Sequence, residues 1–435
     1  MLTFLGFGMV VTFMVLIMTK RLSPLLALII VPIIFGLIGG FGSELRPMML
    51  DGIKNLAPIA VMLMFAILFF GVMIDTGLFE PIVKRILKIV GGDPLKITLA
   101  TAALSLFVSL DGDGSTAYMI TGAALLPLYR RTGINPLIFT CIMMMSGSLM
   151  NLTPWGGPTA RAASVLKVTP NDLFLPMIPV MVACAVWIFV VAYIFGIKER
   201  KRLGMSTAVN LAEDREEAFE ENTKPQSDYH RKLLPINFLI TLALMVSLVL
   251  NVLPLPVLFM VGFCVALIVN YPNPDQQRER LIAHAGNALS VSSMIFAAGI
   301  FTGILSGTGM VDAMAGSVVS WIPERMSPYL PIIIAGLSLP FTFFISNDAF
   351  YFGILPVLMT AAAKYGFTPG EVGIASLVGQ QVHLLSPLVP STYLLVGLAK
   401  VELGDHQRFT LPWALGSSVV MLIAALLFGV IPLTH

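Results

Sequence analysis

The amino-acid sequence predicts an all-α polytopic membrane protein made of two inverted repeats, each with five membrane spans and one re-entrant hairpin. The first observation is composition: 57% of the 435 residues are apolar, only 11% are charged, and the mean hydropathy is +0.90. Soluble globular domains do not reach such values. The second observation is a set of motif residues that recurs in the second half. The third is the uneven placement of lysine and arginine among the predicted loops.

A short polar segment interrupts the apolar sequence of the first half, at Leu110-Asp111-Gly112-Asp113-Gly114-Ser115-Thr116. The stretches on either side, 97–110 and 117–129, are too short to cross a hydrocarbon core of about 30 Å, which takes about 20 helical residues. They predict a re-entrant hairpin over residues 97–129, with its polar tip partway through the membrane. Basic residues at both feet place those feet on the cytoplasmic side, namely Lys96, Arg130 and Arg131.

The two aspartates of this tip, Asp111 and Asp113, are expected to be functional. Inserting a carboxylate at the centre of a membrane span costs on the order of 3 kcal/mol of free energy. Two carboxylates in one tip therefore indicate a function. The structural alternative is an Asx turn in which the aspartates close the hairpin.

The rest of the first repeat, residues 1–198, is built mainly of apolar spans. Runs of spanning length lie at 2–19, 23–40, 55–77 and 175–196, and a basic amphipathic stretch at 78–96 is expected at the cytoplasmic surface. One long span, 136–166, is broken at Asn151-Leu152-Thr153-Pro154-Trp155-Gly156-Gly157-Pro158, which cannot continue as regular helix. The charged segment 199–232 is a cytoplasmic linker that divides the chain.

The second repeat, residues 233–435, restates features of the first at a spacing of 231 to 233 residues. Gly71, Thr76 and Gly77 recur as Gly303, Thr308 and Gly309; Ser115 recurs as Ser346; Thr153-Pro154 and Lys167-Val168 recur as Ser386-Pro387 and Lys400-Val401. Agreement at a near-constant spacing indicates a duplication. The second hairpin is therefore predicted at 327–362, with the tip Ser346-Asn347-Asp348, and the second broken span at 370–399, interrupted at 386–390.

The positions of the basic residues predict the orientation of the chain in the membrane. An odd number of spans in each repeat turns the second copy upside down. With the amino terminus outside, the predicted cytoplasmic loops hold 20 of the 26 lysines and arginines, the outer loops hold five, and Arg161 lies within a span. This bias predicts that both termini are extracytoplasmic.

Two oppositely directed hairpins and two broken spans bring four helix amino-terminal ends toward the middle of the membrane. Each such end offers free N–H donors and about half a positive charge. The sequence therefore predicts a socket for a small anion.

The motif around Asp111, followed downstream by Pro154-Trp155-Gly156-Gly157-Pro158-Thr159-Ala160-Arg161-Ala162-Ala163-Ser164, resembles the citrate-divalent metal:proton symporter family of the ion transporter superfamily. The resemblance extends over nearly the whole chain. It implies a homodimer in which a scaffold domain holds the interface and a transport domain of hairpins and broken spans moves as an elevator. It also implies citrate complexed with a divalent metal as the substrate, taken up with protons. The superfamily's Ser-Asn-Thr signature at hairpin tips is only partly kept, as Ser115-Thr116 and Ser346-Asn347.

The chemistry of the residues agrees with this substrate. A divalent ion lowers the charge of citrate and presents hard oxygen coordination, for which Mg²⁺, Mn²⁺ and Ca²⁺ are equally suitable candidates. The metal would travel with the substrate, and no permanently bound cofactor is expected. The candidate substrate-binding residues are Ser115, Thr116, Asn151, Thr153, Arg161, Ser346, Asn347 and Ser386, and the candidates for metal contact or proton coupling are Asp111, Asp113 and Asp348.

Several alternatives remain open at this stage. Arg161 has a structural alternative, a pair with a structural carboxylate, and its counterpart in the second repeat is Leu394. His383 is more often a satisfied buried polar residue than a ligand in such a position. A proton- or sodium-coupled carrier of dicarboxylates or other small anions is the second candidate function. An intramembrane aspartyl hydrolase is a remote one, since the two aspartates lie on one tip. The basic residues follow topology and indicate no nucleic-acid partner.

Overall fold

The computed structural model describes residues 1–19, 21–90, 92–111, 114–203, 228–250, 252–321, 323–344, 346–386 and 389–433. These residues form helices joined by turns, with no β-strand among them. Among the described residues, six helices are long and apolar enough to cross a membrane, namely Leu45–Asp75, Pro170–Leu203, Lys232–Val249, Pro274–Gly307, Arg325–Phe344 and Leu403–Leu427. Eight further apolar helices among the described residues have only 10–17 residues, which is typical of broken spans and hairpins.

The two halves of the chain contain helices in corresponding order. In the first half these are α1 (Leu2–Met18), α2 (Pro24–Ile38), α3 (Leu45–Asp75), α4 (Glu80–Val90), α5 (Pro94–Val108), η1 (Ser109–Asp111), α6 (Gly114–Thr132), α7 (Pro136–Met150), α8 (Gly157–Leu166) and α9 (Pro170–Leu203). In the second half they are α11 (Asp228–Val249), α12 (Leu255–Asn270), α13 (Pro274–Gly307), α14 (Met310–Trp321), η2 (Glu324–Tyr329), α15 (Leu330–Phe344), η3 (Ala349–Ile354), α16 (Leu355–Ala363), α17 (Pro369–Leu377), α18 (Gln380–His383), α19 (Pro390–Ala399) and α20 (Leu403–Leu427).

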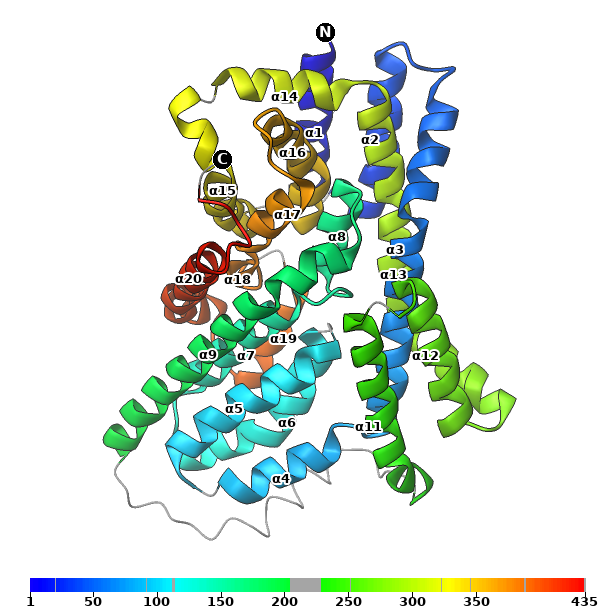
Figure 1. Ribbon diagram of the computed structural model, residues 1–435. Helices are drawn as coiled ribbons and strands as arrows, with labels where there is room; N and C mark the ends of the chain where they lie inside the picture. Colours follow the sequence, from blue (N-terminus) through cyan, green and yellow to red (C-terminus); the bar gives the residue numbers. More distant parts are fainter. Residues whose placement is uncertain are drawn as a thin grey trace.

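The long helices α3 and α13 pack antiparallel along most of their length (Figure 1). At one end Asp75 contacts His284, and further along the Ser292 hydroxyl donates to the carbonyl of Ala60 at 3.2 Å. Toward the other end the backbones touch, because a Cβ on Gly52 would lie 1.9 Å from the carbonyl oxygen of Gly299. Glycine is required there to let two helices approach so closely. Helices α4 and α14 lie at opposite ends of this pair (Figure 1).

The hairpins and broken spans form a second group of helices beside the α3–α13 pair (Figure 1). Within this group α5 packs on α9 and α7, and α20 packs on the same two helices. The second half interleaves with the first, since α19 packs against α6 and α7 and α17 packs against α8. The described residues next to the hairpin tips therefore lie near the broken spans, with η1 against α7, η3 against α8 and α15 against α18.

Left-handed backbone positions recur at the spacing of the sequence repeats. Lys167 and Lys400, which end α8 and α19, have φ values of 55° and 57°. A left-handed conformation is uncommon for any residue with a Cβ. Its occurrence at two helix ends that match in sequence agrees with a duplication. Gly77 and Gly309 share it, with φ values of 72° and 73°. The inverted orientation of the repeats in a membrane stays a prediction.

The second broken span differs from its expected shape. We expected one interruption at 386–390, whereas the helix already ends at Leu377 and resumes for a single turn in α18. The early break lies against α15: a Cβ on Gly379 would lie 2.4 Å from the backbone of Ser338, and the Thr342 hydroxyl donates to the Gly379 carbonyl at 3.0 Å. The contact with α15 thus supplies the partner that the broken helix no longer provides.

Candidate functional site

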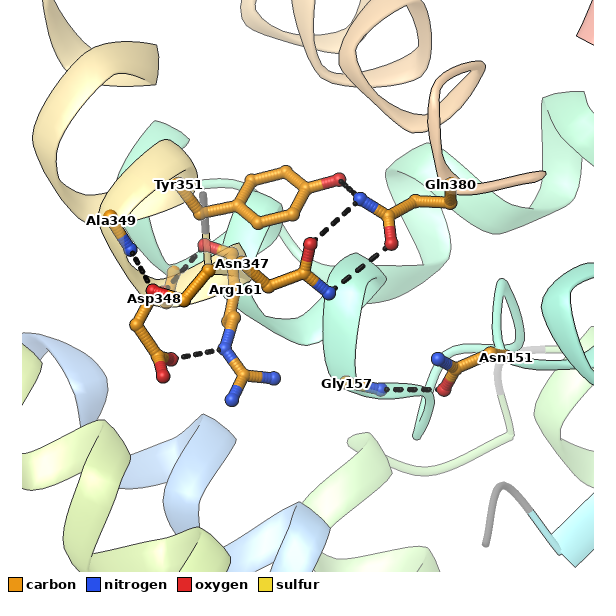
Figure 2. Close-up of polar contacts among 10 residues, drawn as sticks. Asn151, Gly157, Arg161, Asn347, Asp348, Ala349, Tyr351 and Gln380 are labelled. Atoms are coloured by element: carbon orange, nitrogen blue, oxygen red, sulfur yellow. Dashed lines mark hydrogen bonds and ion pairs between the residues drawn. The ribbon is translucent and has the colours of Figure 1, made fainter. Parts of the chain in front are cut away.

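An ion pair links the first broken span to the tip of the second hairpin. Arg161 lies in α8, and its Nε donates to Oδ1 of Asp348 at 2.7 Å (Figure 2). The two side chains are 20% and 11% exposed, so they lie largely out of solvent. The residues are 187 positions apart in sequence. The pair therefore ties the two halves of the chain together at their centre.

The hairpin tip leaves the carboxylate of Asp348 available for this contact. Asp348 is the residue before η3, where an aspartate commonly accepts from the backbone N–H groups of its own helix, yet its side chain does not do so. The Ser346 hydroxyl instead accepts from the N–H of Ala349 at 3.2 Å. The segment Ala349–Ile354 that follows is a π-helix, a form often found at functional sites.

A buried amide network fixes the same tip to the second broken span. Asn347 and Gln380 exchange two hydrogen bonds, of 3.2 and 3.0 Å, and Gln380 Nε2 also donates to the hydroxyl of Tyr351 at 3.0 Å (Figure 2). Asn347 and Tyr351 are one helical turn apart, so both reach Gln380 from one face. A reciprocal amide pair satisfies both side chains and holds the tip in one geometry.

The break in the first span is closed by its own side chains. Asn151 Oδ1 accepts from the N–H of Gly157 at 3.3 Å, which covers one of the free donors at the start of α8 (Figure 2). The turn requires glycine at position 156, because a Cβ there would lie 1.8 Å from the Asn151 carbonyl oxygen. The Thr153 hydroxyl is buried and has no hydrogen-bond partner within the described part of the chain. Thr153 is thus the open polar group of this turn.

The first hairpin tip lies against the same turn. Trp155 Nε1 donates to the carbonyl of Leu110 at 2.9 Å, and its ring packs on Phe70 of α3 and Phe259 of α12. Thr116 is half-buried in the first turn of α6. The expected roles of Asp113 and of the Asp111 and Ser115 side chains lie outside the described residues.

The second break is also stabilised by hydrogen bonds. Ser386 is fully buried there, and His383 Nδ1 lies 2.8 Å from the carbonyl of Thr342, so this nitrogen carries the proton and donates. The Thr392 hydroxyl in the first turn of α19 donates to the carbonyl of Leu384. His383 is therefore a buried polar residue with a hydrogen-bond partner at Nδ1.

A cavity of about 350 Å³ lies between the α3–α13 pair and the end of α8. Its polar lining includes two charged side chains, Asp51 and Lys167, and the uncharged side chains of Asn55, Ser164 and Thr302. Its volume is in the usual range for ligand pockets, roughly 300–1,000 Å³. Ser164 is one helical turn from Arg161 in α8, but neither Arg161 nor Asp348 lines the cavity.

A second ion pair lies at the far end of this group of helices. Asp93, the N-cap of α5, accepts from Arg200 near the end of α9. Burial alone would raise the pKa of Asp93, but the hydrogen bonds from Arg200 and from the Leu95 N–H hold it below its ordinary value. No group of three histidine, cysteine, aspartate or glutamate side chains that could hold a metal ion occurs among the described residues.

The structure brings part of the expected site together. Arg161, Ser346, Asn347 and Asp348 lie at one junction, whereas Asn151 is engaged in capping α8. Gln380 and Tyr351 were not among the candidate residues. The available signals were a glutamine in an otherwise apolar span and a tyrosine one helical turn after Asn347, and neither signal specifies a contact by itself.

Comparison with known proteins gives matches over nearly the full length. The profile of the citrate transporter family matches residues 13–379. A Bacillus subtilis (strain 168) protein named "Citrate transporter" is 57% identical over 431 residues, which is 99% of this chain and 100% of that protein. Another protein of the same organism, named "Mg(2+)/citrate complex secondary transporter", is 52% identical over 100% of both chains.

Solved structures of transporters share the fold at low sequence identity. The Alcanivorax borkumensis YdaH transporter aligns with a TM-score of 0.63 and 15% identity, over 91% of this chain and 90% of that one. Neisseria gonorrhoeae MtrF aligns with a TM-score of 0.59 and 14% identity, over 88% and 84%. The family and the full-length relatives are transporters, which confirms that the chain is no enzyme and removes the hydrolase alternative. The chain is a multi-pass membrane transporter that belongs to the citrate transporter family.

Proposed function

We propose that this protein takes up citrate as a complex with a divalent metal ion, with Mg²⁺ the first candidate, coupled to protons. The observation that carries this proposal is the junction of Arg161 and Asp348, which places a binder of carboxylates beside an oxygen ligand for a cation. The relative named for the Mg(2+)/citrate complex, 52% identical over the full length, supports the same substrate.

The metal makes citrate easier to carry. Citrate has about three negative charges at neutral pH, and a bound divalent ion leaves about one, so much less charge must be desolvated in the protein. The amino-terminal end of α8, the helix that carries Arg161, adds N–H donors beside the junction. The open hydroxyl of Thr153 is available to a further substrate oxygen, and the buried Ser386 remains a candidate contact. Ser115, Thr116, Asn151 and Ser346 remain candidates for secondary contacts.

Alternating access takes place by an elevator movement. The helices α5–α9 and α15–α20 form the transport domain, and the α3–α13 pair with α2, α11 and α12 forms the scaffold in a homodimer. The cavity between α8 and the α3–α13 pair supports this division, as does the docking of Trp155 on Phe70 and Phe259. The antiparallel packing of α3 and α13 supports inverted repeats, with both termini extracytoplasmic and the linker 199–232 inside.

Proton coupling is assigned to the carboxylates of the hairpin tips. Asp348, Asp111 and Asp113 are the candidates, because a cation and a proton compete for the same carboxylate oxygens, so metal binding releases protons. The variant Asp113→Asn is expected to abolish citrate-driven proton movement in proteoliposomes that contain a pH-sensitive dye. Proton-coupled uptake that stays intact in this variant would remove Asp113 from the mechanism.

The test of the proposed function is uptake of radiolabelled citrate into proteoliposomes of the full chain. Uptake is expected with Mg²⁺, Mn²⁺ or Ca²⁺ and a proton gradient, and it should fall to background when a chelator removes the metal. Equal uptake of citrate with and without chelator would contradict the proposal, as would uptake of succinate but not citrate. Either result would favour the carrier of dicarboxylates or other small anions.

A further inference from the structure

The ion pair at the centre of the site also offers a reason for metal dependence. Resting on the proposed function, we infer that Arg161 and Asp348 form an exchange pair that selects metal-bound citrate over free citrate. On loading, the guanidinium exchanges Asp348 for a citrate carboxylate, and Asp348 turns to the cation or to its water shell. No covalent bond changes in this exchange.

The geometry of the pair leaves its remaining polar atoms available. The contact uses Nε of Arg161 and Oδ1 of Asp348 only, and within the described residues neither Nη group nor Oδ2 has a hydrogen-bond partner (Figure 2). The two Nη groups can bind a carboxylate in the paired geometry typical of arginine. Oδ2 is the kind of hard oxygen that Mg²⁺ or a water in its shell accepts.

Electrostatics then favours one form of the substrate. The pair is 20% and 11% exposed and neutral as a whole, and a largely buried charge that loses its partner is strongly unfavourable. Free citrate would engage Arg161 but leave Asp348 unpaired beside further carboxylates of the same sign. The metal complex supplies a carboxylate for Arg161 and a cation for Asp348, so both charges remain compensated.

The surroundings hold both partners of the exchange in position. The Asn347–Gln380 amide pair fixes the backbone directly before Asp348, while Ser346 supplies the cap that Asp348 leaves open. On the other side, Gly157 makes room for the guanidinium, because a Cβ there would lie 2.8 Å from Nη1 of Arg161. Exchange therefore requires rotation of two side chains and no movement of the backbone.

The pair occurs on one side of the molecule only. At the related positions of the other half the residues are Leu394 and Ala117, so these two positions form no second ion pair. The substrate is thereby oriented, with a carboxylate toward α8 and the metal toward the second hairpin.

The inference is tested by calorimetric titration of the purified full chain in lipid nanodiscs with citrate, first in a chelator and then at increasing Mg²⁺. In the wild type, Mg²⁺ is expected to tighten citrate binding at least ~10-fold. In Asp348→Asn the ratio should fall below ~3-fold, because free citrate then binds tighter than in the wild type. Asp348→Ser, neutral and smaller, carries the same expectation should the asparagine variant fail to fold.

Matched variants separate this exchange from general effects. Asp312→Asn removes an exposed carboxylate in α14 and should keep the wild-type ratio, whereas Arg161→Gln should weaken citrate binding with and without Mg²⁺. If a neutral variant at position 348 kept the wild-type ratio of citrate affinities with and without Mg²⁺, the inference would be overturned. The ion pair would then serve only to stabilise the fold. A wild type that binds no citrate under either condition would instead refute the proposed function.

Discussion

The two junctions between hairpins and broken spans share a backbone frame but differ in chemistry. On both sides a threonine in the first turn of the second arm donates to a preceding carbonyl, Thr159 to Leu152 and Thr392 to Leu384, and a left-handed lysine ends that arm. Yet Arg161 corresponds to Leu394, and Gln380 corresponds to Gly147, 233 residues earlier.

This difference separates the helix caps and turns, which both broken spans require, from the charged side chains, which occur at one junction. A broken helix leaves free backbone groups wherever it occurs, so both breaks require the same caps and turns. A single small anion needs only one charged partner of each sign. The proposed site is accordingly unequal at these positions: Gly147 lies near the hydroxyl of Tyr118, whereas Gln380 donates to the hydroxyl of Tyr351.

The largest expected effect comes from a substitution in the turn before α8, the helix that carries Arg161. Gly156→Ala places a Cβ 1.8 Å from the Asn151 carbonyl oxygen, so the turn before α8 must move. A cost above ~3 kcal/mol and loss of citrate binding are expected, measured by thermal unfolding in detergent and by calorimetry.

Gly397→Ala in α19 is the matched control on the other junction. Its Cβ would meet nothing within 4 Å, so stability should stay equal or rise by up to ~1 kcal/mol. If both alanine variants behaved alike, the turn before α8 would not be the constrained element described above.

A smaller effect is expected from the amide network at the second hairpin. Gln380→Leu leaves Asn347 and the Tyr351 hydroxyl without the hydrogen bonds that Gln380 provides, at a cost of ~2–4 kcal/mol, because both groups are buried. The opposite junction provides the comparison, since Gly147→Ala adds a Cβ at ordinary contact distances, 3.5 Å from Leu384 and Tyr118, and should be tolerated. Thermal unfolding of the two variants side by side gives the answer, and an equal loss in both would contradict the one-sided network.

The smallest effect is expected at the peripheral ion pair of Asp93 and Arg200. The pKa of Asp93 is lowered in the folded protein, so its contribution is present above the unfolded pKa of about 3.9 and is lost as the pH falls through the folded value. Asp93→Asn keeps the N-cap and removes the charge.

At pH 7 this variant should lose less than ~1 kcal/mol, since the pair is partly exposed and screened. The difference from the wild type should shrink toward pH 3, and citrate binding at pH 7 should not change. A stability difference that grew as the pH fell would reverse the assigned sign.

The all-helical class of the fold followed from the sequence, because long apolar runs predict helices and clusters of glycine and proline predict where helices end. The first break, for instance, ends α7 at Met150 and starts α8 at Gly157, as its proline and glycine content predicts. The break at Gly379 was not predicted, since it depends on close contact with Ser338 of α15, and no local pattern encodes that contact.

The site was predictable in its residue types and only partly in its contacts. Polar residues at hairpin tips identified Asn347 and Asp348 because burial of such groups without a reason is unfavourable. The pairing of Asp348 with Arg161 spans the two halves of the chain and follows from three-dimensional packing alone. Asn151 shows the converse, since a polar residue at a break serves equally well as a cap.

The most direct test of the account is a structure of the full chain in lipid nanodiscs with citrate and Mn²⁺, whose stronger scattering locates the metal. The account predicts a citrate carboxylate within hydrogen-bonding distance of the Arg161 Nη groups, the cation or its water shell at Asp348, and an Nε–Oδ1 distance well beyond the present 2.7 Å. Citrate bound elsewhere with the Arg161–Asp348 pair intact would contradict it.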